Sequence, residues 1–280
     1  MTRWTMDRLV RTSARSPSGR FALRVARDLG RLELIDRGMT LAAHVFTSII
    51  PILIVAGAVR SRIDPKTGPI FAEHLGLDVA SAEILEKSLP GGAQELRATG
   101  VIGLVLLVIA ATSFARALER SLRTIWHTPR IGVTFAWRWL AALIAVIIGL
   151  ALIVATRIIV VGDGAIPVIE FTAEIVVWGA LWWIAWWIVI NRHISLRALL
   201  PGSVLAGIGF AVAGLFGRVI LPPLLADSAL RFGVLGMAFT YIGWLLVLAC
   251  ILLIAATVGR VVYLTYSGRA WRRSVSAPRS

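Results

Sequence analysis

Six long, nearly uncharged hydrophobic stretches divide the chain, and each approaches the roughly 20 residues that a helix needs to cross a bilayer. The stretches are residues 38–59, 98–115, 139–161, 171–190, 198–225 and 232–259. Apolar residues follow one another in them without the regular alternation of a membrane β-barrel strand. The pattern therefore predicts an all-α fold, a polytopic bundle of six transmembrane helices.

The composition agrees with a membrane location for most of the chain. Among its 280 residues, 58% are hydrophobic and only 16% are charged, and the mean hydropathy is +0.83. A single soluble core could not hide that much apolar surface. We expect three regions: a basic cytoplasmic segment at 1–37, a transmembrane domain at 38–264, and a basic, disordered cytoplasmic tail at 265–280.

Lysine and arginine are distributed unequally over the two sides of the predicted membrane. The segments on the amino-terminal side hold 21 of the 29 Lys and Arg residues, but only 5 of the 15 Asp and Glu residues. Positively charged loops are typically retained in the cytoplasm. Both termini are therefore expected on the cytoplasmic face.

Two helical segments next to the predicted spans carry stripes of arginine. The cations are Arg20, Arg24, Arg27 and Arg31 in the first stripe, and Arg116, Arg120 and Arg123 in the second. Steps of three and four residues place each set on one helical face, and apolar residues occupy the other face. We expect basic amphipathic helices at the membrane interface. Two interpretations remain. The stripes would only set the topology and anchor the helices at the membrane surface, or they would form a cytoplasmic vestibule that gathers an anionic headgroup or solute.

The net charge of +14 taken alone would also suit a nucleic-acid-binding protein. The cations, however, flank apolar stretches, where anionic lipids attract them. Their stripes also lack the interleaved aromatic residues of a single-strand groove. We therefore expect membrane lipids with anionic headgroups as partners, and no nucleic acid.

The first predicted span contains His44, Ser48 and Pro51. Pro51 lacks a backbone donor and frees a carbonyl about one turn earlier, so a kink is expected there. The hydroxyls of Thr47 and Ser48 could satisfy the loosened backbone. Because ionisable groups in a bilayer are costly, they are functional candidates. The cluster is a candidate gate or transport path, and a purely structural kink is the alternative.

Charged residues also occur at the outer ends of later spans. Arg157 lies near the end of the third span and Arg218 near the end of the fifth. Glu170 and Glu174 flank the start of the fourth span on the same side. Pairing would lower the cost of each charge, so we predict at least one arginine–glutamate contact between these helices. That contact would be either a structural clasp or part of a solute path.

Two further patterns concern helix packing. The fourth span holds five tryptophans, Trp178, Trp182, Trp183, Trp186 and Trp187, which we expect to form a lipid-facing wall or a packing surface rather than a ligand platform. In the fifth span, small residues recur every fourth position at Gly209, Ala213 and Gly217. Such a seam permits close helix approach, either to a helix of the same chain or to a second copy in a homo-oligomer.

Four segments, in order, resemble the YihY/BrkB family of bacterial inner-membrane proteins, whose YhjD-type members they match best. They are "LAAHVFTSIIPILIVAGA" (41–58), "ALERSLRTIWHTPR" (117–130), "LRALLPGSVLAG" (196–207) and "RFGVLGMAFTYIGWLLVLACILL" (231–253). The similarity extends from about residue 30 to residue 264. It implies a six-span protein of the bacterial inner membrane, with envelope-related transport, for example of lipid, as the usual proposal for the family.

Two family expectations do not transfer to this chain. Many relatives end the last span with Gly-Ala-Glu, whereas this chain has Ala255, Ala256 and Thr257, so no role for that acid can be carried over. The family was formerly labelled ribonuclease BN. A metal nuclease needs clustered ligands, but the four histidines of this chain lie far apart in the sequence. The ribonuclease label therefore finds no support here.

These features predict a transporter or flippase-like facilitator for an amphipathic, anionic envelope molecule or lipid. Its path would follow a polar seam through His44, Ser48, Arg157 and Arg218. The rival is a non-catalytic membrane scaffold for envelope assembly. An enzyme is not expected, because carboxylates are scarce in the spans and none is paired with a histidine at helical spacing. We also expect no cofactor. The Gly-rich loop with lysine that binds nucleotide phosphates is absent, and a single cysteine, Cys250, cannot form a cysteine-based zinc site.

Overall fold

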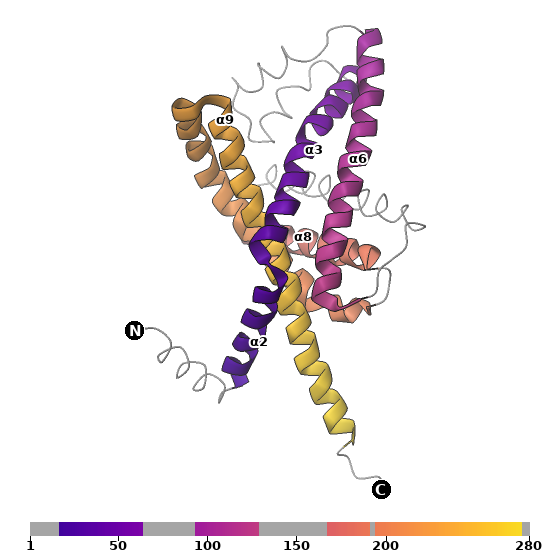
Figure 1. Ribbon diagram of the computed structural model, residues 1–280, viewed down its shortest axis with the longest axis vertical. Helices are drawn as coiled ribbons and strands as arrows, with labels where there is room; N and C mark the ends of the chain where they lie inside the picture. Colours follow the sequence, from indigo (N-terminus) through magenta and orange to yellow (C-terminus); the bar gives the residue numbers. More distant parts are fainter. Residues whose placement is uncertain (1–16, 64–92, 129–166, 191–193, 276–280) are drawn as a thin grey trace.

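The computed structural model describes residues 17–63, 93–128, 167–190 and 194–275 (Figure 1). These residues form five helices and no strand: α2 (Pro17–Leu32), α3 (Leu34–Ile63), α6 (Ala93–Trp126), α8 (Pro167–Val189) and α9 (Leu196–Val275). The all-α prediction is confirmed for this part of the chain. The predicted span at 139–161, together with Arg157, lies outside the described residues.

Three helices are long and apolar enough to cross a membrane, through Val101–Trp126 of α6, Phe171–Val189 of α8 and Leu196–Thr265 of α9. Large apolar side chains are exposed along them, as in the first turns of the α6 segment, where Val101 and Leu104 are more than half exposed. A soluble protein rarely tolerates so much contiguous apolar surface, whereas lipid covers it without cost. The chain is therefore an integral membrane protein.

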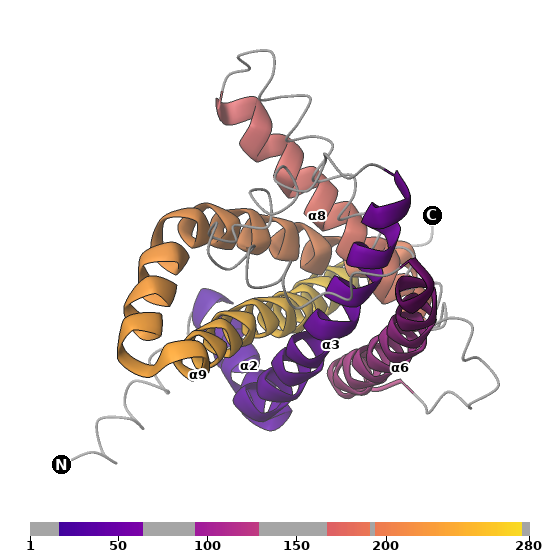
Figure 2. The ribbon, with the colours of Figure 1, turned by 90° about the horizontal axis from the view of Figure 1, so that it is seen from above.

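α9 contains the fifth and sixth predicted spans as the two arms of one helical hairpin. The arms part at Gly233, whose φ of 63° and ψ of −149° lie outside the helical region. The second arm returns along the first (Figure 2), so that Trp244 covers Gly217. Near the bend, the hydroxyls of Ser228 and Thr240 lie 2.6 Å apart and share a hydrogen bond between the arms.

The bend differs from the sequence expectation. Hydropathy predicted a break between the two spans at residues 226–231, whereas helix continues through this segment. Two local interactions keep its polar residues helical: Ser228 donates to the carbonyl of Leu224 at 2.7 Å, and Arg231 pairs with Asp227 at 3.1 Å one turn away. At its other end α9 continues to Val275, well into the segment expected to be a disordered tail.

Glycines let α8 and the two arms of α9 touch backbone to backbone. A Cβ added to Gly207 of the first arm would lie 2.9 Å from the backbone nitrogen of Gly179 in α8. A Cβ on Gly202 would lie 3.1 Å from the carbonyl oxygen of Ala255 in the second arm. Both positions therefore require the smallest residue: Gly207 lets α8 approach the first arm, and Gly202 lets the two arms approach one another. α8 itself runs obliquely to α3 and α6 (Figures 1 and 2).

The core lies where the C-terminal part of α6 meets α8 and α9. The largest fully buried side chain there is Trp186, at 1% exposure. The second arginine stripe belongs to this same end of α6. It was predicted as an interfacial helix, but residues 116–126 continue α6 without interruption. Leu118, Leu122 and Ile125, the apolar face of that segment, are at most 5% exposed and pack in the protein core.

The first arginine stripe forms the separate helix α2, as predicted. α2 ends at Leu32, and Glu33 after it has a left-handed φ of 53° and turns the chain into α3. Arg37 caps the end of α2, because its Nε donates to the carbonyl of Leu32 at 2.8 Å. Leu32 is buried at 2% exposure, so the turn is held against the core.

We predict that Gly233→Ala destabilises the protein by about 1–3 kcal/mol, because an L-residue is strained at this φ and ψ. The lower melting temperature would be measured on purified protein in detergent. Gly243→Ala is the matched control. An added Cβ meets no atom within 4 Å at either glycine, but Gly243 is helical, so alanine there should leave stability unchanged or raise it by up to about 1 kcal/mol. Equal effects of the two substitutions would contradict the assigned bend.

Candidate functional site

Glu174 of α8 and Arg218 of the first arm of α9 form an ion pair between two candidate spans. The guanidinium Nη2 donates to the carboxylate Oε1 at 2.6 Å. The side chain of Glu174 is 5% exposed, whereas that of Arg218 is 44% exposed. This is the arginine–glutamate contact that the sequence predicted between these helices, and it is confirmed.

The buried carboxylate of Glu174 lies against α9 one turn before its partner. A Cβ at Gly214, four residues before Arg218, would lie 3.9 Å from Oε2 of Glu174, an ordinary contact distance. In a poorly solvated environment, a short charge-assisted hydrogen bond offsets part of the cost of burying both charges. Of the two side chains, that of Arg218, at 44% exposure, is the one that another anion could approach.

The predicted cluster in the first span lies on α3, which packs on α6 and α9. Pro51 is buried within α3 and does not end it. The hydroxyls of Thr47 and Ser48 donate to the carbonyls of His44 and Val45 at 3.0 and 2.6 Å. The two hydroxyls therefore bond back to their own helix one turn earlier, as expected near a proline. The cluster therefore lies on α3, whereas the Glu174–Arg218 pair joins α8 to α9.

The predicted headgroup contacts differ in their surroundings. Exposed side chains belong to Arg20, Arg24, Arg27, Arg31, Arg116 and Arg120. Arg123 is half-buried instead and lies 3.5 Å from Glu119, which is 6% exposed. The second stripe thus carries its own buried acid, which neutralises its last arginine. Sequence analysis missed this, although Glu119 stands one turn before Arg123, a spacing that indicates pairing on a helix.

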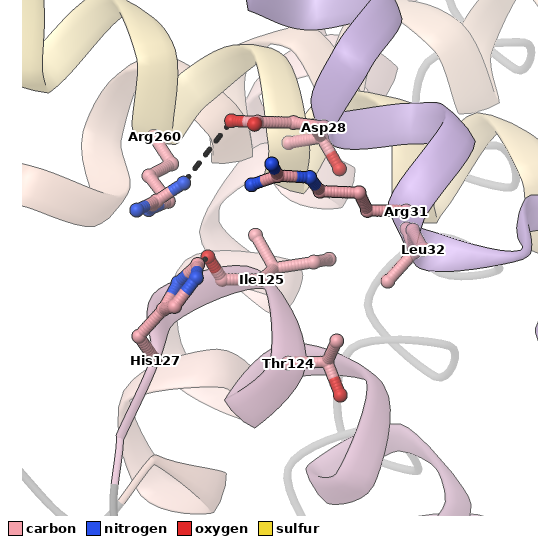
Figure 3. Close-up of a pocket in the computed structure, with 8 residues that line it drawn as sticks. Asp28, Arg31, Leu32, Thr124, Ile125, His127 and Arg260 are labelled. Carbon is pink, nitrogen blue, oxygen red and sulfur yellow. Dashed lines mark hydrogen bonds and ion pairs between the residues drawn. The ribbon is translucent and has the colours of Figure 1, made fainter.

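A second long-range ion pair joins α2 to the second arm of α9. Arg260 donates from Nη1 to Oδ2 of Asp28 at 3.1 Å, across 232 positions of sequence. The pair borders a cavity of about 80 Å³ that is formed by α2, the end of α6 and α9 (Figure 3). Neither residue was a sequence candidate. Asp28 could have been noticed as the one acid within the first arginine stripe, but its partner could not.

The tryptophans of α8 form a packing surface, one of the two alternatives that the sequence left open. Trp182 and Trp186 are buried in the core, and the rings of Trp178 and Trp182 lie 4.9 and 5.3 Å from that of Phe210 in α9. Trp183 donates from Nε1 to the carbonyl of Leu196 at 2.9 Å. These contacts hold α8 against the first arm of α9 and so place Glu174 opposite Arg218.

The small-residue seam has a partner within the chain at two of its three positions. Ile251 and Trp244 of the second arm cover Gly209 and Gly217, and Ala213 between them is buried. The seam thus closes the α9 hairpin. Homo-oligomer formation through these residues stays a prediction. Within the described ranges, no group of three His, Cys, Asp or Glu side chains could hold a metal ion.

The family model described as virulence factor BrkB matches residues 25–277, which is nearly the whole chain. The matched range includes the Glu174–Arg218 pair, the α3 cluster and the cavity beside Arg260. No curated protein and no solved structure matches the chain.

We predict that Glu174 and Arg218 stabilise one another by about 1–3 kcal/mol in a double-mutant cycle, because their hydrogen bond is short and charged. Glu174→Gln, Arg218→Met and the double variant would be unfolded by denaturant in detergent. The double variant should lose less stability than the sum of the two single losses. Arg231 and Asp227 form an exposed pair in α9, with side chains 68% and 58% exposed, and should show coupling below about 0.5 kcal/mol. Additive losses at Glu174 and Arg218 would contradict the assigned pair.

Proposed function

Since the chain belongs to the YihY/BrkB family of bacterial membrane proteins, we propose that it is a transporter or flippase-like facilitator of an amphipathic, anionic envelope molecule or lipid. The observation that carries the proposal is the Glu174–Arg218 pair between two candidate spans. Apolar packing alone would hold α8 on α9 without the cost of burying a carboxylate. Charged groups kept inside a membrane protein commonly mark a solute path.

The proposal includes six crossings, with both termini in the cytoplasm of a bacterial inner membrane. Two observations support this topology. The excess of Lys and Arg falls on the amino-terminal side of the predicted spans. In addition, α2 and the C-terminal end of α9 lie at the same end of the molecule (Figure 1). The Asp28–Arg260 pair joins these two helices, as expected if both face the same compartment.

In the proposed path, the exposed arginines of α2 and of the α6 end concentrate anionic molecules at the cytoplasmic face. The headgroup then moves toward Arg218, which is held by Glu174 and whose side chain is 44% exposed. An arriving anion would compete with Glu174 for the guanidinium, so the pair would both bind the headgroup and release it. His44, Ser48 and Pro51 would act as a gate in α3, and Arg157 as a further cation on the outer side.

We predict that Arg218→Gln lowers transport by about tenfold, since a lost charge-assisted hydrogen bond of about 1.5 kcal/mol corresponds to that factor. Proteoliposomes with fluorescent phosphatidylglycerol in the inner leaflet would report movement to the outer leaflet by dithionite quenching. Arg231→Gln, an exposed arginine in the same helix, is the matched control and should transport like the wild type. Size-exclusion profiles would establish that each variant is folded. Wild-type flux no higher than that of empty vesicles, or equal flux with Arg218→Gln, would reject the proposal.

A further inference from the structure

The cavity beside Arg260 collects more positive than negative charge. Its lining comes from three helices that are distant in sequence: Asp28, Arg31 and Leu32 of α2, Thr124 and Ile125 of α6 with His127 after it, and Thr257 and Arg260 of α9. The volume of about 80 Å³ is well above the roughly 10–15 Å³ that one water needs. The space is therefore large enough for a small polar group.

Two guanidinium groups but only one carboxylate line this cavity. Arg260 is bonded to Asp28 at 3.1 Å, with side chains only 19% and 28% exposed. Arg31 makes no hydrogen bond or ion pair with any residue that the structure describes. Figure 3 shows the side chain of Arg31 extending toward Arg260, with the ring of His127 on the other side of the cavity. A bound anion would neutralise the excess charge between them.

The backbone at the edge of the cavity provides an independent observation. His127 has a left-handed φ of 54°, and the N–H of Thr128 donates to the carbonyl of Arg123 at 3.3 Å. This arrangement ends many helices, and glycine is the usual residue at the left-handed position. Within the described residues, the only other non-glycine residue with a positive φ is Glu33, directly after the lining residue Leu32. One of these two residues, His127, lines the cavity and the other follows a lining residue, and such strain gathers at binding sites.

From these observations, we propose that the cavity binds a phosphate group. Two guanidinium forks can donate to several oxygens of a tetrahedral phosphate at once, and His127 can add a ring donor. Asp28 would be the internal anion that occupies Arg260 until the phosphate replaces it. Leu32 and Ile125, at 2% and 5% exposure, form an apolar wall suited to the carbon side of a phosphate ester. The phosphate would belong either to a lipid headgroup or to a soluble phosphate.

This inference rests on the proposed function, and it identifies the chemical group that the cytoplasmic face would select. Of the arginines in the two stripes, only Arg31 lines the cavity. Arg260 and His127, which belong to neither set of arginines, complete the proposed site. The other arginines of α2 would then attract anions without binding any one of them in a fixed geometry.

The first test measures binding of inorganic phosphate to the full chain in detergent by isothermal titration calorimetry, at constant ionic strength. Arg31→Gln and Arg260→Gln should each raise the dissociation constant at least tenfold. Arg20→Gln is the matched control, since Arg20 is an exposed cation of the same helix outside the cavity, and should change it less than twofold. Wild-type affinity in both cavity variants, or equal weakening by Arg20→Gln, would overturn the proposal.

Two further variants test the geometry without depending on the stability of Arg260→Gln. Asp28→Asn should bind phosphate several-fold more tightly, because it frees Arg260 from its internal partner. His127→Gly suits the left-handed backbone, so it should keep or raise the melting temperature while it weakens phosphate binding. Weaker binding by Asp28→Asn would refute the exchange at Arg260. Unchanged phosphate binding by His127→Gly would show that the imidazole ring does not contact the phosphate.

The source of the phosphate is distinguished in lipid nanodiscs. If a lipid headgroup fills the cavity, phosphatidic acid in the nanodisc should compete with inorganic phosphate and raise its apparent dissociation constant, relative to phosphatidylcholine alone. Unchanged affinity would assign the site to a soluble phosphate. Phosphate binding without lipid flux in proteoliposomes would leave this site established and reject the proposed function. If Arg31→Gln loses phosphate binding but keeps wild-type lipid flux, the cavity does not belong to the transport path.

Discussion

The close contact of α8 with the two arms of α9 is the constraint on which the other features depend. It exists because glycines stand at the crossing points, where Gly207 meets the backbone of Gly179 and Gly202 meets that of Gly259. Membrane helices gain little from hydrophobic association in lipid, so tight packing of this kind supplies much of the attraction between them. A larger residue at Gly207 would move α8 away and separate Glu174 from Arg218, and one at Gly202 would push the two arms of α9 apart.

The two long-range ion pairs lie in different environments and have different consequences. Glu174–Arg218 connects candidate spans, and its carboxylate is almost fully buried, so its cost must be offset locally. Asp28–Arg260 lies at the end of the molecule where α2, α6 and α9 meet, beside an open cavity with surplus positive charge. In the proposed function, the Asp28–Arg260 pair lies at the entrance and holds the headgroup, and the Glu174–Arg218 pair is a later contact of the same headgroup.

Much of the fold could be predicted from the sequence, because hydropathy and helical spacing are local properties. The helices at α2, α3, α6, α8 and both arms of α9 follow from them, and so did the contact of Arg218 with Glu174, since each charge needed a partner in an apolar setting. The environment of the second arginine stripe could not be predicted. The same apolar face at Leu118 and Leu122 serves equally against lipid or protein, and periodicity cannot distinguish these surroundings.

The class of protein, the approximate positions of its described helices and the excess of arginine at the ends of the predicted spans follow from the amino-acid sequence, since each depends on residue type and spacing along the chain. Which charges meet depends on the packing of the helices. Asp28 and Arg260 are 232 positions apart, and no local pattern links them. Their contact, the cavity beside it and the approach of Arg31 and His127 depend on how α2, α6 and α9 pack, which is set by many buried contacts acting together.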